Sequence, residues 1–247
     1  MSESKPVTAI LEKAASETRN ALGDNLVSLV LYGSHARGDA TAQSDINLFL
    51  VVRDSAVSKL EGLTKVVPGW TKHHVVAPII FEQEQLARSL DTFALEFLEM
   101  AAARRVLAGE DPFAAFTPDW AAVRIELEEE AREKLIQLQR TWLMWGHHDK
   151  TLRKILGDTV PGYLAMARGV LHLQRQSVDS IATQAVFDGT IHWPGFDPQV
   201  WRRLWETAKG LHIPSTSAVS QLMRDYLQQA QSLVRYIDGL VQTTKLS

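Results

Sequence analysis

A short polar segment holds the residues of this chain whose types and spacing could do chemistry. It reads Gly33-Ser34-His35-Ala36-Arg37-Gly38, and six residues later comes Ser44-Asp45-Ile46-Asn47. Glycines permit tight turns, a serine hydroxyl and backbone N–H groups bind anions, and an arginine can hold a phosphate through two hydrogen bonds. Asp45 and Asn47 are separated by one residue, so on a strand both side chains face the same side, where their oxygens could ligate Mg²⁺. The segment therefore suits a metal-bound triphosphate.

Apolar runs on both sides of this segment must position it. Residues 26–32 and 45–52 are nearly continuous in apolar side chains, which is typical of buried strands. A third strand is expected at residues 74–77, cut by Pro78. Around these strands we expect helices over residues 7–22, 55–67, 82–89 and 91–107.

The second half of the chain has a helical pattern. Residues 119–145 carry apolar side chains at three- to four-residue spacing, which predicts one long amphipathic helix. No strand pattern follows residue 115 or so. We therefore expect an α+β fold with an N-terminal domain over residues 1–115 and an all-helical bundle over residues 116–247. Its further helices are expected over residues 150–156, 161–174, 178–187, 198–209 and 217–241.

Bulk composition narrows the class of protein. The chain has 247 residues, a formal net charge of −3 and no cysteine. With this slightly negative charge, we expect no general binding to nucleic acid or to membranes. The absence of cysteine excludes disulfides and thiolate metal sites. With no signal peptide or membrane span in the pattern, we expect a cytoplasmic protein, and an oligomer is possible.

The polar segment resembles the signature of the DNA polymerase β-like nucleotidyltransferase superfamily, a Gly-Ser turn with a basic residue and then an Asp-x-Asp strand. By layout the chain is similar to aminoglycoside and minimal nucleotidyltransferases. The resemblance implies a mixed sheet with helices, followed by a helical bundle. It also implies a nucleotide site in which Gly33, Ser34, Arg37 and Ser44 bind ATP or another NTP.

The same resemblance implies a magnesium site, with two departures. Asp45 matches a family metal ligand, whereas Asn47 stands where the second aspartate is expected. The strand expected to carry a third carboxylate reads Lys-His-His-Val-Val-Ala over residues 72–77, so His74 is the candidate metal ligand there. Two acidic residues, Glu82 and Glu84, lie beyond Pro78, where a helix is expected to start, so they are not on the expected strand.

Two functions from different classes follow. One is an enzyme that transfers a nucleotidyl group, AMP from ATP, to a hydroxyl of a small molecule or protein. Asp45 and Asn47 are then its catalytic metal ligands, and Glu126 on the long helix is the candidate general base. The alternative is a catalytically inactive nucleotide-binding or protein-interaction module on the same scaffold. A third reading, a helical ribonuclease, rests only on a faint resemblance of Arg140 and His147 to the HEPN motif.

Overall fold

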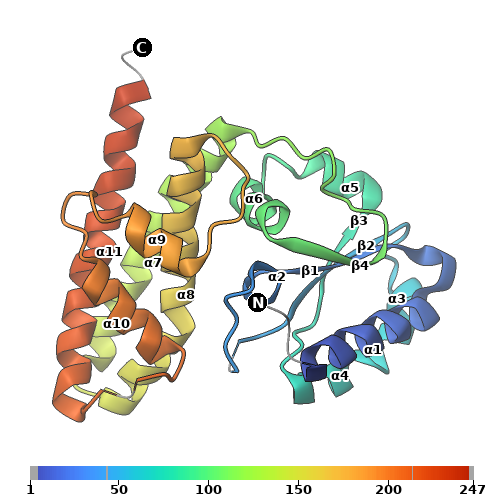
Figure 1. The fold of residues 1–247 in the computed structure, drawn as a ribbon, viewed down its shortest axis with the longest axis horizontal. Helices are drawn as coiled ribbons and strands as arrows, with labels where there is room; N and C mark the ends of the chain where they lie inside the picture. Colours follow the sequence, from blue (N-terminus) through green and yellow to red (C-terminus); the bar gives the residue numbers. More distant parts are fainter. Residues whose placement is uncertain (1–4, 43, 213, 245–247) are drawn as a thin grey trace. The chain divides into compact units, whose positions relative to one another are not determined.

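The computed structural model describes residues 5–42, 44–212 and 214–244. The chain divides into two compact units (Figure 1). The first comprises the chain up to Asp119 with Val178–Ser180, and the second comprises Trp120–Ser177 and the chain from Ile181 onward. Each unit has its own elements and its own core, so each is described by itself.

A four-stranded mixed sheet forms the centre of the first unit (Figure 1). The strand order is β3-β2-β1-β4. β1 pairs antiparallel with both β2 and β4, whereas β2 and β3 run parallel. The α+β class with a mixed sheet, predicted from the apolar runs, is confirmed. The strands are β1 (Leu26–Tyr32), β2 (Asn47–Val52), β3 (Ile79–Glu82) and β4 (Arg104–Gly109).

Helices cover both faces of this sheet. On one face, α1 (Lys5–Leu22), α3 (Val57–Thr64) and α4 (Val67–Trp70) bury apolar side chains against alternate residues of β1 and β2 (Figure 1). On the other face, α5 (Gln83–Arg88) and α6 (Ala94–Ala102) pack a core rich in phenylalanine. Burial on both faces explains why β1 and β2 are continuous apolar runs in the sequence.

The segment 91–107 was predicted as one helix, and this is wrong. α6 ends at Ala102, and the chain then forms β4 along the edge of β1. Leucine, alanine and arginine are good helix formers, so the local pattern continues the helix. Backbone pairing with β1 decides the conformation instead, because tertiary contacts override such weak local preferences.

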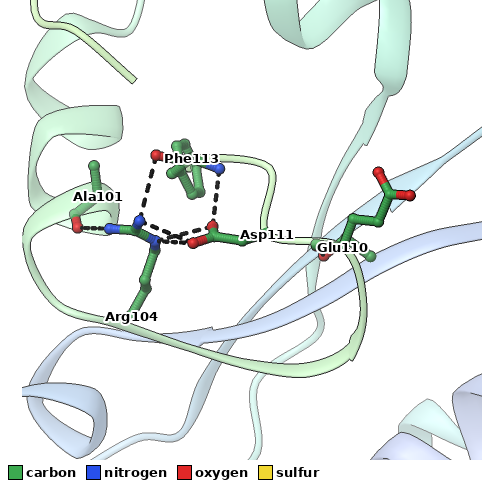
Figure 2. A network of polar contacts seen from close by, with 6 residues as sticks. Ala101, Arg104, Glu110, Asp111 and Phe113 are labelled. Atoms are coloured by element: carbon green, nitrogen blue, oxygen red, sulfur yellow. Dashed lines mark hydrogen bonds and ion pairs between the residues drawn. The ribbon is translucent and has the colours of Figure 1, made fainter. Parts of the chain in front are cut away.

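Arg104 fastens the start of β4 to the loop that follows the strand (Figure 2). Its guanidinium donates from Nε and Nη2 to the Asp111 carboxylate, with the Nη2–Oδ2 distance at 2.9 Å. It also donates to the carbonyl oxygens of Ala101 and Phe113. The Asp111 carboxylate in turn accepts a hydrogen bond from the Phe113 backbone N–H. The network therefore joins the end of α6, β4 and the following loop (Figure 2).

Helices alone make up the described part of the second unit. α8 packs against α7, α10 and α11, and a cluster of buried aromatic rings fills the space between α8, α10 and α11. No helix among the described residues is both long enough and apolar enough to cross a membrane. The helices are α7 (Trp120–Trp145), α8 (Asp149–Arg175), α9 (Thr183–Gly189), α10 (Pro198–Ala208) and α11 (Thr216–Thr244).

The predicted break between residues 156 and 161 is absent. α8 continues through Pro161, although proline removes one helical hydrogen bond. Residues on both sides of it, Leu156, Val160 and Leu164, are buried on one face of α8. Continuous burial of this face holds the helix together across the proline.

Candidate functional site

The glycine-serine turn lies directly after the central strand β1. Gly33 has φ 77° and ψ −149°, and Gly38 has φ 84° in the left-handed region. Between them the one-turn helix α2 (Ser34–Arg37) is closed by hydrogen bonds from Arg37 N to Gly33 O and from Gly38 N to Ser34 O, both 2.9 Å. Both φ values are costly for any residue with a β-carbon, which explains why glycine stands at each end of the turn.

Asp45 and Asn47 lie at the entry of β2, on the face opposite Ile46. Ile46 is buried in the core under α1, and Asn47 begins β2 opposite Tyr32 of β1. Alternation along the strand therefore directs Asp45 and Asn47 to the other face, where Asp45 is exposed and Asn47 is half-buried. A β-carbon at Gly33 would lie 3.2 Å from Asn47 Nδ2, so the amide lies against the turn. The structure thus brings Gly33 and Asn47 together.

Ser44 and His35 connect the turn to this strand entry. The His35 Nε2 nitrogen lies 3.2 Å from the Ser44 carbonyl oxygen, which can only accept a hydrogen bond. The buried Ser44 hydroxyl accepts from the Thr41 backbone N–H at 2.9 Å, and the Ser44 N–H donates to the Thr41 carbonyl at 3.0 Å. Ser44 therefore closes the loop before Asp45. Its role as a nucleotide contact stays a prediction.

Arg37 is placed at the end of the turn, with its side chain between two carboxylates. Its Nε donates to Asp39 Oδ2 at 3.3 Å, and its Nη1 lies 3.6 Å from Glu99 Oε2 on α6. Phosphate binding by Arg37, predicted from its residue type, would have to compete with these two negative charges.

The strand next to β2 presents an apolar residue to the Asp45 face. Val75 pairs with Ile46 and is buried in the same core, so Val76, the next residue, is directed to the opposite face. The predicted strand at residues 74–77 is therefore displaced: only an isolated bridge forms at Val75, and β3 itself starts at Ile79. A valine thus occupies the position that would suit a third carboxylate.

His74 and Glu82 lie at other places along this segment. His74 is exposed, with φ 59°, and its carbonyl oxygen accepts from the Ile46 N–H at 2.8 Å. The Glu82 carboxylate accepts from the Ser55 hydroxyl at 2.7 Å and from its backbone N–H at 2.8 Å, and these bonds lower the Glu82 pKa. Metal binding by His74 stays a prediction. Within the described residues, no group of three or more His, Asp and Glu side chains could hold a metal ion.

The sequence reasoning missed three residues near this face, Tyr32, Glu96 and Glu99. Tyr32 pairs with Asn47 across the strands, and its pKa is raised first by burial and then by the charge of Glu96. Glu96 and Glu99 lie on α6, within the segment 91–107 for which the sequence predicted only a helix. The available signal was their three-residue spacing on an otherwise apolar helix, which puts two carboxylates on neighbouring positions.

Glu126, the candidate general base, lies on α7 in the second unit. It is half-buried, next to the fully buried Leu127. Arg140 and His147 are exposed at the end of α7 and after it. The general-base role of Glu126 stays a prediction, and so does the hypothesis of a helical ribonuclease.

Comparison with known proteins supports the assignment that the turn suggests. Residues 11–100 match the family model of the nucleotidyltransferase domain. They belong to the nucleotidyltransferase superfamily. This nucleotidyltransferase domain runs from Leu11 within α1 to Met100 within α6, with β1 to β3 and α2 to α5 between them. It therefore contains the whole Gly33–Asn47 segment.

Two individual relatives are similar to the chain. Over 80 residues, or 32% of this chain, it is 26% identical to a Methanocaldococcus jannaschii protein assigned as a protein adenylyltransferase. That match spans about half, 48%, of the relative's length. In fold the chain is similar to spectinomycin adenyltransferase AAD(9) from Enterococcus faecialis, solved with ATP and spectinomycin. The TM-score is 0.59 at 12% identity, over 90% of this chain and 98% of that one.

Proposed function

We propose that this protein transfers a nucleotidyl group, AMP from ATP, to a hydroxyl of a small molecule or protein. The observation that carries the proposal is the packing of the Gly33 turn against Asn47, with Asp45 on the same face. This arrangement puts an anion-binding turn beside two oxygen ligands within one nucleotidyltransferase domain.

In this proposal the phosphates lie at the turn. Gly33 lets the backbone approach a phosphate closely, and Ser34 offers its hydroxyl and N–H. Ser44 supports the site by fixing the loop that leads to Asp45. The polar groups of the turn hold the triphosphate with its α-phosphate toward Asp45.

The donor set fits one Mg²⁺ ion that arrives with the triphosphate. Mg²⁺ is commonly held by one or two protein oxygens together with phosphate oxygens and water. Asp45 supplies a carboxylate and Asn47 an amide oxygen, whereas Val76 offers no ligand. Asp45 and Asn47 carry one negative charge between them, which suits one ion better than two. When bound, the single ion would neutralise phosphate charge.

The reaction balances without a further reactant. The acceptor hydroxyl oxygen bonds to the α-phosphorus, the bond from that phosphorus to the β-phosphate bridging oxygen breaks, and pyrophosphate leaves. The hydroxyl proton goes to a general base. Both relatives bear names of adenylyl-transferring proteins, one acting on a small molecule and one on proteins, and this supports AMP as the transferred group.

Calorimetric titration with ATP, combined with a pyrophosphate assay, tests the proposal. We expect ATP to bind more tightly with Mg²⁺ than without it, and Asp45→Ala to lose that difference. Pyrophosphate release in the presence of a hydroxyl acceptor, spectinomycin or protein, should disappear in the same variant. Binding that ignores both Mg²⁺ and Asp45, with no pyrophosphate released, would favour the inactive module instead.

A further inference from the structure

The arginine of the turn is paired with two carboxylates, one two residues further along the chain and one on α6. Arg37, Asp39 and Glu99 have side chains only 9%, 16% and 18% exposed. The guanidinium lies 3.3 Å from Asp39 and 3.6 Å from Glu99, measured between the nearest nitrogen and oxygen atoms. An ion pair that is this well covered is screened by water and salt far less than a surface pair.

The helix that carries Arg37 cannot hold its shape alone. α2 has four residues, and a single helical turn is unstable in water because few hydrogen bonds offset the ordering of its backbone. Glu99 by contrast lies on α6, whose neighbouring Phe97 and Met100 are buried in the core. The Arg37–Glu99 ion pair therefore connects the short helix α2 to α6, which is held by the core.

The Asp39 contact completes this attachment from within the loop. Asp39 follows Gly38, and its backbone N–H donates to the Ser34 carbonyl at 3.1 Å while its carboxylate accepts from Arg37. Arg37 is thereby fixed to its own turn by Asp39 and to α6 by Glu99. A triphosphate drawing the guanidinium away would leave two carboxylates close together in a poorly hydrated place, which is costly.

We propose that Arg37 is a positioning residue of the nucleotide site, with Glu99 as its anchor, and that it contacts no phosphate itself. It keeps Gly33 and Ser34 where they can bind the triphosphate. This inference rests on the proposed function for the identity of the ligand. It adds Glu99, a residue of α6, to the nucleotide site.

Whether Glu99→Gln weakens or strengthens ATP binding separates this role of Arg37 from direct phosphate binding. If Arg37 positions the turn through Glu99, Glu99→Gln and Arg37→Lys both weaken ATP binding, by about threefold or more, and the double variant is little worse than either. If Arg37 binds phosphate, Glu99→Gln releases the guanidinium and removes a repelling charge, so ATP binds more tightly. Calorimetric titration with Mg-ATP, well below the melting temperature, measures both. Glu99→Asp, which keeps the charge, should recover part of the lost affinity.

A matched control is Glu84→Gln, which breaks the exposed Arg88–Glu84 pair on α5, also in the first unit. It should leave ATP affinity unchanged. Tighter or unchanged ATP binding by Glu99→Gln would overturn the inference. If the unaltered protein binds no ATP at all, the proposed function fails by itself. The link between Arg37 and Glu99 is then tested by melting temperature, and additive losses in Arg37→Lys and Glu99→Gln would overturn it.

Discussion

At position 47 an amide stands beside the turn where a carboxylate would bind a metal ion more strongly. The change from Asn47 to aspartate replaces one nitrogen by oxygen and adds one negative charge, with almost no change in volume. The side chain already lies against Gly33, so the new carboxylate would face the same space. In the proposed site, the residue at position 47 would therefore change the affinity for Mg²⁺ more than the shape of the turn.

We predict that Asn47→Asp strengthens Mg²⁺-dependent ATP binding by about tenfold, which corresponds to about 1.4 kcal/mol. Without Mg²⁺ the same variant should bind ATP more weakly, because the added charge repels the phosphates. Calorimetry with and without Mg²⁺ measures both effects. Val76→Asp is a companion variant that places a carboxylate on the segment beside the entry of β2. Equal ATP affinities for Asn47→Asp and the unaltered protein in Mg²⁺ would show that position 47 is no metal ligand.

Gly33 is a second residue of the proposed site where a small change, the addition of a β-carbon, should have a measurable effect. A β-carbon there would be strained at φ 77° and would crowd Asn47 Nδ2 at 3.2 Å. We predict that Gly33→Ala lowers the free energy of unfolding by about 1–3 kcal/mol and displaces Asn47. Urea unfolding measures the loss. Gly69→Ala, in the helix α4 with open space around it, is the control and should stay within about 0.5 kcal/mol.

At the scale of elements, Arg104 and Asp111 secure the edge strand β4. Hydrogen bonds from the Arg104 side chain hold the Asp111 pKa below its ordinary value, and a backbone bond from Phe113 adds to this. Because the pKa is lower in the folded state, the carboxylate stabilises the fold at neutral pH. That contribution is lost as the pH falls from the unfolded pKa of Asp111 through its folded pKa.

We therefore predict that Asp111→Asn costs about 1 kcal/mol at pH 7 and flattens the acid limb of the stability curve. Urea unfolding across the acidic range provides the measurement. At a pH below the folded pKa of Asp111, the variant and the unaltered protein should converge. A variant whose stability ran parallel to that of the unaltered protein at every pH would contradict the role given to Asp111.

The sequence predicted the strands whose two faces are buried, and missed elements that depend on distant partners. β1 and β2 were visible because nearly all of their residues, on both faces, are apolar. β4 was not, because Arg104 to Gly109 reads as a helix until it pairs with β1. Ser34, Asp45 and Asn47 were identified by type and spacing, whereas Glu99 could not be connected with Arg37, because only the packing of α6 on the sheet brings them together.

At the scale of the molecule, the two units have separate hydrophobic cores. The proposed nucleotide site lies wholly in the first unit. ATP at about 100 times its Kd should stabilise the state that binds it by about 2.7 kcal/mol. We predict that hydrogen exchange slows in β1 and β2 by up to about a hundredfold, and much less in α8 and α10. Mass spectrometry of peptide fragments measures this. Equal slowing in both units would contradict a site confined to the first.

Label transfer from ATP tests most directly whether this chain transfers AMP, as proposed. The protein is incubated with Mg²⁺, a hydroxyl acceptor (spectinomycin or protein) and ATP labelled on either the α- or the γ-phosphate. We predict covalent labelling of the acceptor from α-labelled ATP only, and its loss in Asp45→Ala. Labelling from γ-labelled ATP, or none from either form while ATP still binds, would contradict the account.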